Sequence, residues 1–175
     1  MLEQYRSPGA LPEDALGRLT TLAARLFQVP VAFVSLIDGQ RQFFVSRHGL
    51  NISGTARKAA FCDYTLAQGD ILCVPDTFTD PRFRDNPLAQ GYPHIRFYAG
   101  IPLLTPDEHC IGTVFLTDRQ PRPALTDTDR QHLADIDALI MDRMEVQRLE
   151  LLRHASQQRL QAMPCGSVSL STGQA

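Results

Sequence analysis

The stretch Ile95–Asp118, IRFYAGIPLLTPDEHCIGTVFLTD, decides how this chain is expected to fold. Residues 96–104 and 110–117 are rich in aromatic and aliphatic side chains, and the turn TPDE lies between them. Two such runs joined by a short turn are typical of a β-hairpin. Gly100 and Gly112 stand inside the two strands, where a glycine often marks a bulge or a close approach of another group to the backbone.

A second hairpin is expected upstream, around the dipeptide Asp38-Gly39. Residues 31–37 (VAFVSLI) and 42–46 (QFFVS) flank this dipeptide and have the composition of strands. Asp-Gly between two such runs is a strong hairpin signal, because both residues tolerate a positive φ angle. A short apolar run at 71–74 adds another strand. Hairpins without strand–helix–strand alternation favour the α+β class with an antiparallel sheet.

Helices are expected at both ends of this sheet-forming region. Residues 12–28 place leucine and alanine at helical spacing, after a Pro-Glu-Asp start that suits the positive end of a helix dipole. A much longer helix is expected over 127–163. Its start resembles a capping box, in which Thr126 is followed three residues later by Asp129, and Pro164 stops it.

The middle of the chain is expected to cover the sheet. Residues 49–59 have the composition of an irregular surface loop, and a short helix at 61–68 is ended by Gly69. The following stretch, TFTDPRFRDNPLAQGY, contains one Asp-Pro and one Asn-Pro pair, and each pair suits the start of a short helical turn.

The composition of the 175-residue chain argues against several classes of protein. A formal net charge of −2 and a pI of about 6.2 provide no basic excess for nucleic acid. The chain has no apolar run that could span a membrane and no signal peptide at its start, so we expect a cytoplasmic protein. Its four cysteines lack C-x-x-C spacing and its five histidines lack H-x-x-x-H spacing, so no metal site is predicted.

Five segments occur in a telling order. They are FCDYTL (61–66), VPDTFTDPRFRDNPL (74–88), IRFYAGIPL (95–103), IGTVFLTDRQPR (111–122) and LTDTDRQHL (125–133). Together they resemble the GAF domains that stand ahead of bacterial sensor histidine kinases and diguanylate cyclases, from about residue 12 to about residue 145. The resemblance implies a GAF-like (profilin-like) antiparallel sheet of five or six strands, with the first and last helices on one face. Residues 51–92 would cover a pocket on the other.

Two residues depart from the resembled pattern. Glu108 stands where the turn usually carries glycine, so this hairpin is expected to be wider than usual. Phe115 stands in a strand that is commonly richer in cysteine or valine, where it either shrinks the pocket or fills the core.

The expected domain organisation follows from these boundaries. Residues 1–11 form a flexible arm, 12–145 the GAF domain, 146–163 an extension of the signalling helix and 164–175 a disordered tail. In related proteins the last helix continues into an output domain. Since no kinase, cyclase or DNA-binding motif is found here, the chain is expected to be a stand-alone domain or an excised piece.

Candidate ligand-binding residues gather around the expected pocket. They are Cys62, Asp63, Thr65, Asp76, Phe83, His94, Arg96, Tyr98, Gly100 and Thr113. Cys62 starts a short helix, where it is either a sensing thiol or, as we prefer, a small buried hydrophobe. Asp63, with Thr65, and Asp76 are either helix caps or charged groups of the site.

The other candidates have similar alternatives. Arg96 suits an anionic ligand, because guanidinium binds carboxylate or phosphate through two hydrogen bonds. His94 lies at the expected pocket rim, whereas Phe83 and Tyr98 would line an apolar pocket. Ordinary core packing is the competing explanation for both aromatic residues.

No cofactor is identified from the sequence. GAF relatives that attach bilin use a Cys-His pair, but here the order is His109-Cys110 on a turn, so light sensing is not expected. The NKFDE motif of cyclic-nucleotide phosphodiesterase GAF domains is also missing from the sequence. The ligand therefore stays unknown.

The preferred function is a sensory domain that binds a small molecule and signals through its terminal helices. It would form a homodimer through these helices and act on an output kinase or cyclase, in two-component or cyclic di-GMP signalling. An alternative is a structural dimerisation module without ligand. A thiol-dependent enzyme of the free methionine-(R)-sulfoxide reductase type is a third, less favoured hypothesis, and the protein is expected not to be an enzyme.

Overall fold

A six-stranded antiparallel sheet forms the centre of the computed structural model, which describes residues 5, 13–57 and 61–162. The strands follow the order β3-β2-β1-β6-β5-β4, so the two hairpins meet at the central pair β1 and β6. The strands are β1 (Val31–Ile37), β2 (Arg41–His48), β3 (Gly54–Ala56), β4 (Leu72–Val74), β5 (Phe97–Leu104) and β6 (Cys110–Asp118).

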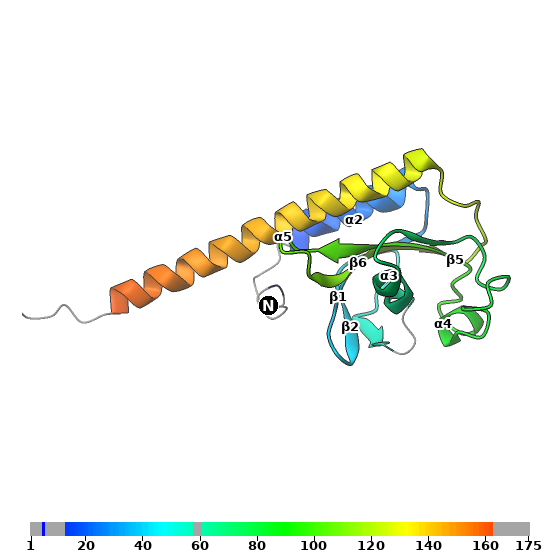
Figure 1. Ribbon diagram of the computed structural model, residues 1–175, viewed down its shortest axis with the longest axis horizontal. Helices are drawn as coiled ribbons and strands as arrows, with labels where there is room; N and C mark the ends of the chain where they lie inside the picture. The colour runs from blue at the N-terminus through cyan, green and yellow to red at the C-terminus, as the bar shows by residue number, and fades with distance from the viewer. Residues whose placement is uncertain (1–4, 6–12, 58–60, 163–175) are drawn as a thin grey trace, which may run out of the picture.

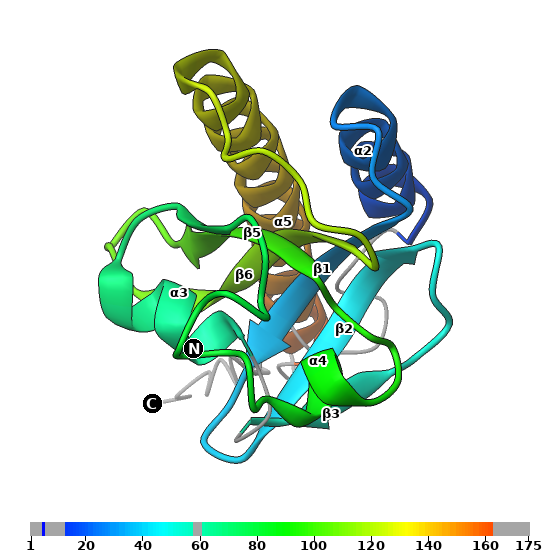
Figure 2. The same cartoon turned by 90° about the vertical axis from the view of Figure 1, so that its right-hand side faces the viewer.

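The helices divide between the two faces of this sheet. The terminal helices α2 (Glu13–Leu26) and α5 (Asp127–Ala162) lie together on one face, as Figures 1 and 2 show. The short helices α3 (Cys62–Gln68) and α4 (Pro87–Gln90) lie on the other. The expected α+β architecture, with terminal helices on one side and a cover on the reverse, is confirmed.

Strand alternation gives each face its own hydrophobic core, because successive side chains point to opposite sides. In β1, Ala32, Val34 and Leu36 belong to the core beneath α2 and α5. Phe33, from the same strand, belongs to the core beneath α3 and α4. The second core is rich in aromatic residues, and it contains the candidate site.

Local sequence signals mark the short helices of the cover, although α3 begins at Cys62, one residue later than predicted. Gly69 ends α3 in the left-handed conformation, with a φ of 70°. The side chain of Asn86 caps α4 by accepting a hydrogen bond of 2.8 Å from the backbone N–H of Leu88. Asp80, the first residue of the Asp-Pro pair, likewise accepts a 3.0 Å hydrogen bond from the backbone N–H of Arg82, as expected at the start of a helical turn.

The hairpin of β5 and β6 accommodates its unusual turn residue through an irregular register. Glu108 has a φ of 60°, in the left-handed region that normally favours glycine. The register shifts between Leu103 and Leu104, as in a β-bulge. The hydroxyl of Thr105 accepts a 3.1 Å hydrogen bond from the backbone N–H of His109, which closes the turn.

One strand was not predicted. Residues 49–59 were expected to be irregular, but Gly54–Ala56 forms the edge strand β3 against β2. A Cβ at Gly54 would lie 2.2 Å from the carbonyl oxygen of Gln42, so only glycine permits this close approach.

The first helix is also shorter than expected, since it ends at Leu26 rather than at residue 28.

The expected flexible arm and disordered tail lie outside the described residues, apart from Tyr5. This side chain is 2% exposed, and its hydroxyl donates a hydrogen bond to Glu145 of α5. Burial and the neighbouring Glu145 raise the pKa of Tyr5 to about 12.

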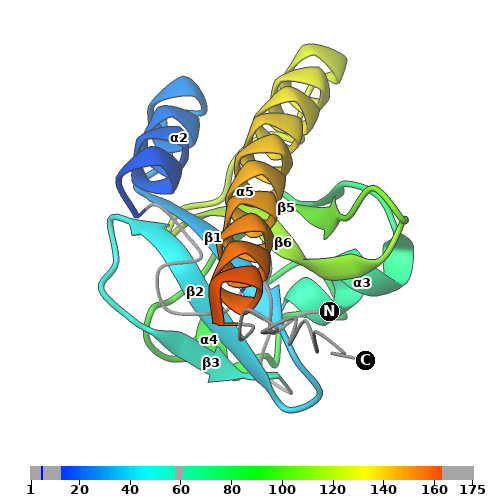
Figure 3. The ribbon, with the colours of Figure 1, turned by 90° about the vertical axis from the view of Figure 1, so that its left-hand side faces the viewer.

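The last helix begins with the predicted capping box. The backbone N–H of Asp129 donates to the Thr126 hydroxyl at 3.1 Å, and the Asp129 carboxylate accepts from the Thr126 N–H at 2.9 Å. The first half of α5 packs on the sheet through Leu133, Ile136 and other buried residues. The second half projects away from the domain, as Figures 1 and 3 show.

A carboxyl group on the packed half of α5 makes stability depend on pH. Asp137 is largely buried, its Oδ1 atom has no hydrogen-bond partner in the described part of the chain, and burial raises its pKa from 3.8 to about 7. The folded state therefore holds this proton over a pH range in which the unfolded state has lost it. The contribution of Asp137 to stability falls as pH rises from about 4 to about 7, and then stays constant.

We expect Asp137→Asn to raise the free energy of unfolding, relative to wild type, more at pH 8 than at pH 5, because asparagine carries no charge at this buried position. The difference in the free energy of unfolding between the variant and wild type should be larger at pH 8 than at pH 5 by about 1 kcal/mol or more, since each pKa unit corresponds to about 1.4 kcal/mol. Urea unfolding at both pH values measures it. Asp142→Asn, on an exposed position of the same helix, is the control and should show no such change. If the free energies of unfolding of the two variants changed equally with pH, the raised pKa of Asp137 would be contradicted.

Candidate functional site

A buried thiol lies at the centre of the second core. Cys62, the first residue of α3, is 1% exposed. Its Sγ atom accepts hydrogen bonds from Gln42 Nε2 at 2.7 Å and from the Thr113 hydroxyl at 3.0 Å. The Tyr98 hydroxyl lies 3.6 Å from the same sulfur. Residues from α3, β2, β5 and β6 therefore converge on one atom.

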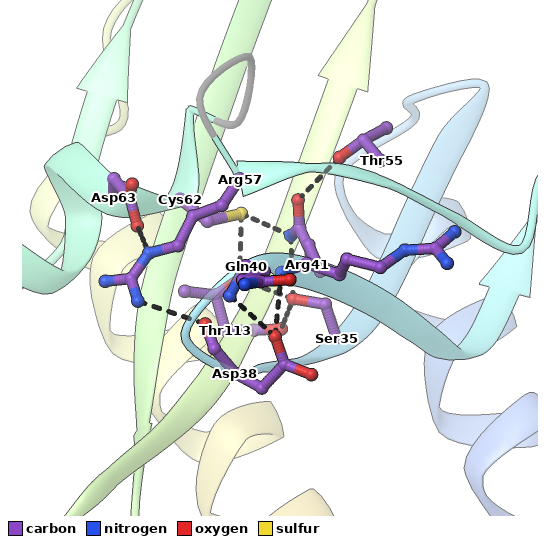
Figure 4. A network of polar contacts seen from close by, with 10 residues as sticks. Ser35, Asp38, Gln40, Arg41, Thr55, Arg57, Cys62, Asp63 and Thr113 are labelled. Carbon is purple, nitrogen blue, oxygen red and sulfur yellow. Dashed lines mark hydrogen bonds and ion pairs between the residues drawn. The ribbon is translucent and has the colours of Figure 1, made fainter.

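A second layer of polar groups holds these donors in place, as Figure 4 shows in part. The Ser35 hydroxyl lies 2.8 Å from the Thr113 hydroxyl and accepts a 2.9 Å hydrogen bond from Gln42 Nε2. The Thr55 hydroxyl donates to Gln42 Oε1 at 3.2 Å. These groups are buried or partly buried, and each has a partner, as burial requires. We call Ser35, Gln42, Thr55, Cys62, Thr65, Tyr98 and Thr113 the polar cluster.

Three members of the polar cluster were not predicted, namely Ser35, Gln42 and Thr55. Ser35 is a polar residue in the apolar run VAFVSLI, which is the signal that could have identified it. Gln42 and Thr55 carry no such signal. They meet because β2 pairs with the unpredicted strand β3, where Gln42 lies opposite Thr55.

Tyr98 is fixed by a hydroxyl on one side and a glycine on the other. Its hydroxyl lies 2.8 Å from that of Thr65, on α3. A Cβ at Gly100 would lie 2.3 Å from the Tyr98 oxygen, so the ring runs over the space that glycine leaves open. Gly100 is therefore a supporting residue for Tyr98.

Burial keeps the polar cluster neutral. Desolvation raises the pKa of the Cys62 thiol, although hydrogen bonds from Thr113, Tyr98 and Gln42 act in the opposite direction. Desolvation, followed by the neighbouring Cys62, raises the pKa of Tyr98 well above its usual range. A neutral thiol is a poor nucleophile, because the thiolate is the reactive form. The cluster therefore offers neutral hydrogen-bonding groups.

Aromatic rings fill most of the space beneath the cover. Phe83, fully buried, stacks on Phe61 with ring centroids 4.6 Å apart, and Phe61 stacks on Tyr98 at 5.2 Å. Tyr98 in turn stacks on Phe115 at 5.6 Å, and Phe115 packs on Phe33 at 5.2 Å. Such pairs add about 1 kcal/mol each beyond the area they bury. Phe115 thus both fills the core and narrows the pocket.

A small cavity of about 30 Å³ remains beside the polar cluster. Its wall includes Gln42, Cys62, Tyr98 and Phe115. A water molecule needs about 10–15 Å³ of this kind of space, whereas pockets for drug-sized ligands measure about 300–1,000 Å³. In this conformation the cavity therefore has room for little more than water, and a larger ligand requires side chains to move.

Several predicted site residues make ion pairs away from the cavity. Asp76 and Arg96 pair through two hydrogen bonds of 2.8 and 2.9 Å, and the guanidinium of Arg96 lowers the pKa of Asp76. Arg96 also lies 4.0 Å from the ring centroid of Phe78. His94 is exposed and has a φ of 62°. None of the three residues Asp76, His94 and Arg96 is among the described residues that line the cavity.

Asp63 has a supporting position at the start of α3. Its carboxylate accepts a 2.8 Å hydrogen bond from Arg57 Nε, and Arg57 Nη1 donates to the carbonyl oxygen of Asp38 at 3.0 Å. Asp38 in turn accepts hydrogen bonds from the backbone N–H groups of Gln40 and Arg41, which shape the turn between β1 and β2. Figure 4 shows how Arg57 joins this turn to α3, the helix that carries Cys62.

The described ranges, 5, 13–57 and 61–162, contain no group of three or more His, Cys, Asp or Glu side chains that could hold a metal ion. They also contain no helix with the length and apolar character needed to cross a membrane.

The sequence matches the family model of the GAF domain over residues 11–141. It is also 39% identical, over 136 residues, to a cyclic di-GMP phosphodiesterase of Pseudomonas aeruginosa. This alignment covers 78% of the chain but only 23% of the relative. The chain therefore spans about a quarter of the length of the curated relative that it matches.

Similar solved structures support the fold. The GAF domain of an Acinetobacter phosphoenolpyruvate-protein phosphotransferase has a TM-score of 0.64 at 16% identity, covering 82% of this chain and 87% of that chain. A free methionine-R-sulfoxide reductase from Neisseria meningitidis has a TM-score of 0.62 at 19% identity, covering 77% and 78%. At such low identity the likeness concerns the fold alone.

The expectation that the protein is not an enzyme is wrong. The curated relative is named as a phosphodiesterase, and the similar structures include methionine-R-sulfoxide reductases. The fold therefore occurs both as one part of a longer protein named as an enzyme and as an enzyme in its own right. The absence of a familiar catalytic motif in this sequence did not justify the expectation.

Proposed function

Because the chain belongs to the GAF domain family, we propose that it is a sensory domain that binds a small molecule and regulates an enzyme of cyclic di-GMP turnover. The cyclic di-GMP part rests on the 39% identity to a phosphodiesterase of this dinucleotide. The proposal of a sensory function rests on one observation, the polar cluster beside a small cavity in an aromatic core.

The polar cluster suits ligand recognition better than it suits stability. Burying hydroxyl, amide and thiol groups costs free energy that hydrogen bonds only offset, and apolar residues of similar shape would pack here at no such cost. Since Cys62 and Tyr98 are neutral, the end of the ligand that reaches them is neutral too. The ligand would exchange some of the cluster's hydrogen bonds for its own.

The proposed signal passes through the sheet to α5. Tyr98 and Phe115 face the cavity, whereas their strand neighbours Ala99 and Leu116 belong to the core beneath the terminal helices. A ligand that displaces the two rings would shift β5 and β6, and α5 rests on this part of the sheet. The long projecting half of α5 would carry that movement to an output enzyme.

A homodimer through the terminal helices is the proposed assembly. Exposed apolar side chains follow both terminal helices, namely Leu22 and Leu26 on α2, Leu139 on the packed half of α5, and Val146, Leu149 and Leu152 on its projecting half. An isolated helix of this kind is marginal in water, so a partner helix would stabilise it. Leu149→Glu is expected to convert dimer to monomer in light scattering, whereas Leu104→Glu, at an exposed leucine on β5, should not.

We place the domain in the cytosol, in agreement with its thiols. Cys62, Cys73 and Cys110 are free, and reduced cysteines are typical of a reducing compartment.

The test of the sensory function is a matched pair of threonine variants. Thr113→Val removes a hydroxyl from the polar cluster, and Thr20→Val removes an equally buried hydroxyl from α2, on the other side of the sheet. Native mass spectrometry of freshly purified wild type should detect a bound small molecule. Thr113→Val should reduce its occupancy about tenfold, which corresponds to the loss of one hydrogen bond of about 1.4 kcal/mol. Thr20→Val should keep it.

The output is tested in cells by deleting the gene and measuring cyclic di-GMP. The concentration should change on deletion, return with wild type and with Thr20→Val, and fail to return with Thr113→Val. Wild-type protein without a bound molecule, together with identical behaviour of the two variants, would instead favour the structural dimerisation module. An unchanged cyclic di-GMP concentration would remove the proposed output.

A further inference from the structure

A larger groove adjoins the small cavity beside the polar cluster. This groove, of about 400 Å³, lies at the end of the sheet where β1 begins and β6 ends. The groove and the cavity share four lining residues: Leu50, Pro93, Ile95 and Thr117. We call these four side chains the partition between the small cavity and the groove.

The two sides of this partition differ in how firmly they are held. On one side, the backbone of Ile95 is tied at both ends: its N–H donates to Leu88 at 2.9 Å, and its carbonyl oxygen accepts from the Thr77 hydroxyl at 2.8 Å. On the other side, Leu50 is only partly buried and lies in the connection of irregular structure between β2 and β3. Leu50 is therefore the part of the partition that can move at the lowest cost.

A glycine places Leu50 in this position. Gly49 has a φ of 81°, and a Cβ on it would lie 1.8 Å from the carbonyl oxygen of Pro30. The chain therefore passes directly over Pro30, which lines the groove, and then delivers Leu50 to the partition. Only glycine allows both the positive φ and this close contact.

The charges of the groove favour an anion. Two ionised side chains line it, Asp118 and Arg119. The Asp118 carboxylate is paired with Arg122 at 2.6 Å, which offsets its charge. Arg119 is exposed, and its guanidinium lies 5.9 Å from the ring centroid of Tyr92, a contact that leaves the positive charge in place. The rest of the lining is mainly apolar, with Pro30, Val31, Leu50, Pro93 and Ile95.

We propose that this groove is the entrance to the buried cavity and a subsite for a small organic anion with an apolar body. The carboxylate of such a ligand would rest near Arg119, and its apolar end would displace Leu50 and reach the polar cluster. The groove is large enough for this, because small-molecule sites measure about 300–1,000 Å³. This inference rests on the proposed function, since it assumes that the cavity admits a ligand.

The test uses two probes of the same shape, 4-phenylbutyrate and the uncharged 4-phenylbutanol. Both are titrated into the ¹⁵N-labelled protein, and the amide signals of the groove (118–120) are followed separately from those of Tyr98 and Thr113. The wild type should bind the carboxylate about tenfold more tightly than the alcohol, as expected for a charge-assisted contact. Both sets of signals should shift.

Substitutions at two positions test separately the charge of Arg119 and the route past Leu50 into the cavity. Arg119→Gln should abolish the tenfold preference for the carboxylate. Its matched control is Arg41→Gln, which removes an exposed arginine whose guanidinium lies 5.8 Å from the Phe43 ring, and this variant should keep the preference. Leu50→Trp should fill the passage, so that the groove signals still shift while those of Tyr98 and Thr113 do not. Leu50→Ala should do the opposite and increase the cavity shifts.

The outcomes distinguish this inference from the function on which it rests. If the cavity signals shift equally in wild type, Arg119→Gln and Leu50→Trp, the cavity binds ligands but the groove is not its entrance, and the inference is overturned. If the cavity signals of the wild type and of Leu50→Ala respond to neither probe, while Thr113→Val still loses a bound molecule in mass spectrometry, the sensory function stands and the organic-anion class is wrong.

Discussion

Replacing Gly112 with alanine is expected to lower the free energy of unfolding by about 4 kcal/mol, which is at the upper end for a single substitution. Gly112 lies in β6 opposite Leu36 of β1, at the centre of the sheet. A Cβ there would lie 1.8 Å from the carbonyl oxygen of Ser35 and 3.0 Å from the Cα atom of Leu36. Both neighbours are backbone atoms of a strand held by β2 on its other side, so neither can move away cheaply.

The same substitution should also disturb the candidate site. Ser35, whose carbonyl oxygen would be displaced, hydrogen-bonds through its side chain to Thr113 and Gln42. Moving β1 away from β6 therefore pulls apart the second layer of the polar cluster. The two effects have one cause, because the glycine and the cluster use the same strand pair.

Urea unfolding measures the change, and the chain supplies a matched control. Gly17 lies in α2, and a Cβ on it would have no neighbour within 4 Å. Gly17→Ala is therefore expected to stabilise the protein by about 0.5–1 kcal/mol, the usual gain for alanine over glycine in a helix. A Gly112→Ala protein that unfolds within 0.5 kcal/mol of wild type would show that β1 and β6 do not approach as closely as described.

Replacing Phe83 with alanine is expected to cost about 3–4 kcal/mol, the range for removal of a buried aromatic side chain. Phe83 is fully buried, stacks on Phe61 at 4.6 Å and meets the Tyr64 ring edge-on at 4.7 Å. Through these two contacts its ring ties the segment of turns that carries it to the start of α3. We therefore expect the cover over the cavity to loosen before the sheet does.

Phe78→Ala is the control for this substitution, because it removes the same ring from the same segment at a site that is 45% exposed. It loses mainly the contact with Arg96, which is worth about 0.5–1 kcal/mol at an exposed site. Hydrogen exchange should show faster exchange of residues 61–90 in Phe83→Ala than in Phe78→Ala. Equal exchange in both variants is the result that would exclude an anchoring role for Phe83.

The elements that were predicted correctly are those set by contacts between residues close together in the sequence. The β1–β2 hairpin was predictable because its turn is local: Asp38 N–H donates to the Arg41 carbonyl at 3.0 Å across the Asp-Gly turn. The capping box of α5 was predictable for the same reason, since Thr126 and Asp129 satisfy each other. The strand β3 was not, because three residues gain strand character only from pairing with β2.

The residues predicted for the candidate site were likewise only partly brought together by the structure. Sequence reasoning named Cys62, Tyr98 and Thr113, and the structure brings these three together around one sulfur atom. It also named Asp76 and Arg96 as ligand-binding groups, but these two side chains pair with each other. Their contact joins residues 20 positions apart, and no local pattern indicates it.

The sequence alone therefore determined the α+β class, the hairpins, the terminal helices and the family, because these depend on short-range periodicity and turn chemistry. Only the tertiary structure decided that Ser35, Gln42 and Thr55 join the polar cluster, and that Leu50 lines both the small cavity and the larger groove beside it. The physical reason is strand register: which side chains share a face and meet across strands depends on pairings between distant segments, and a shift of one residue would exchange every one of them.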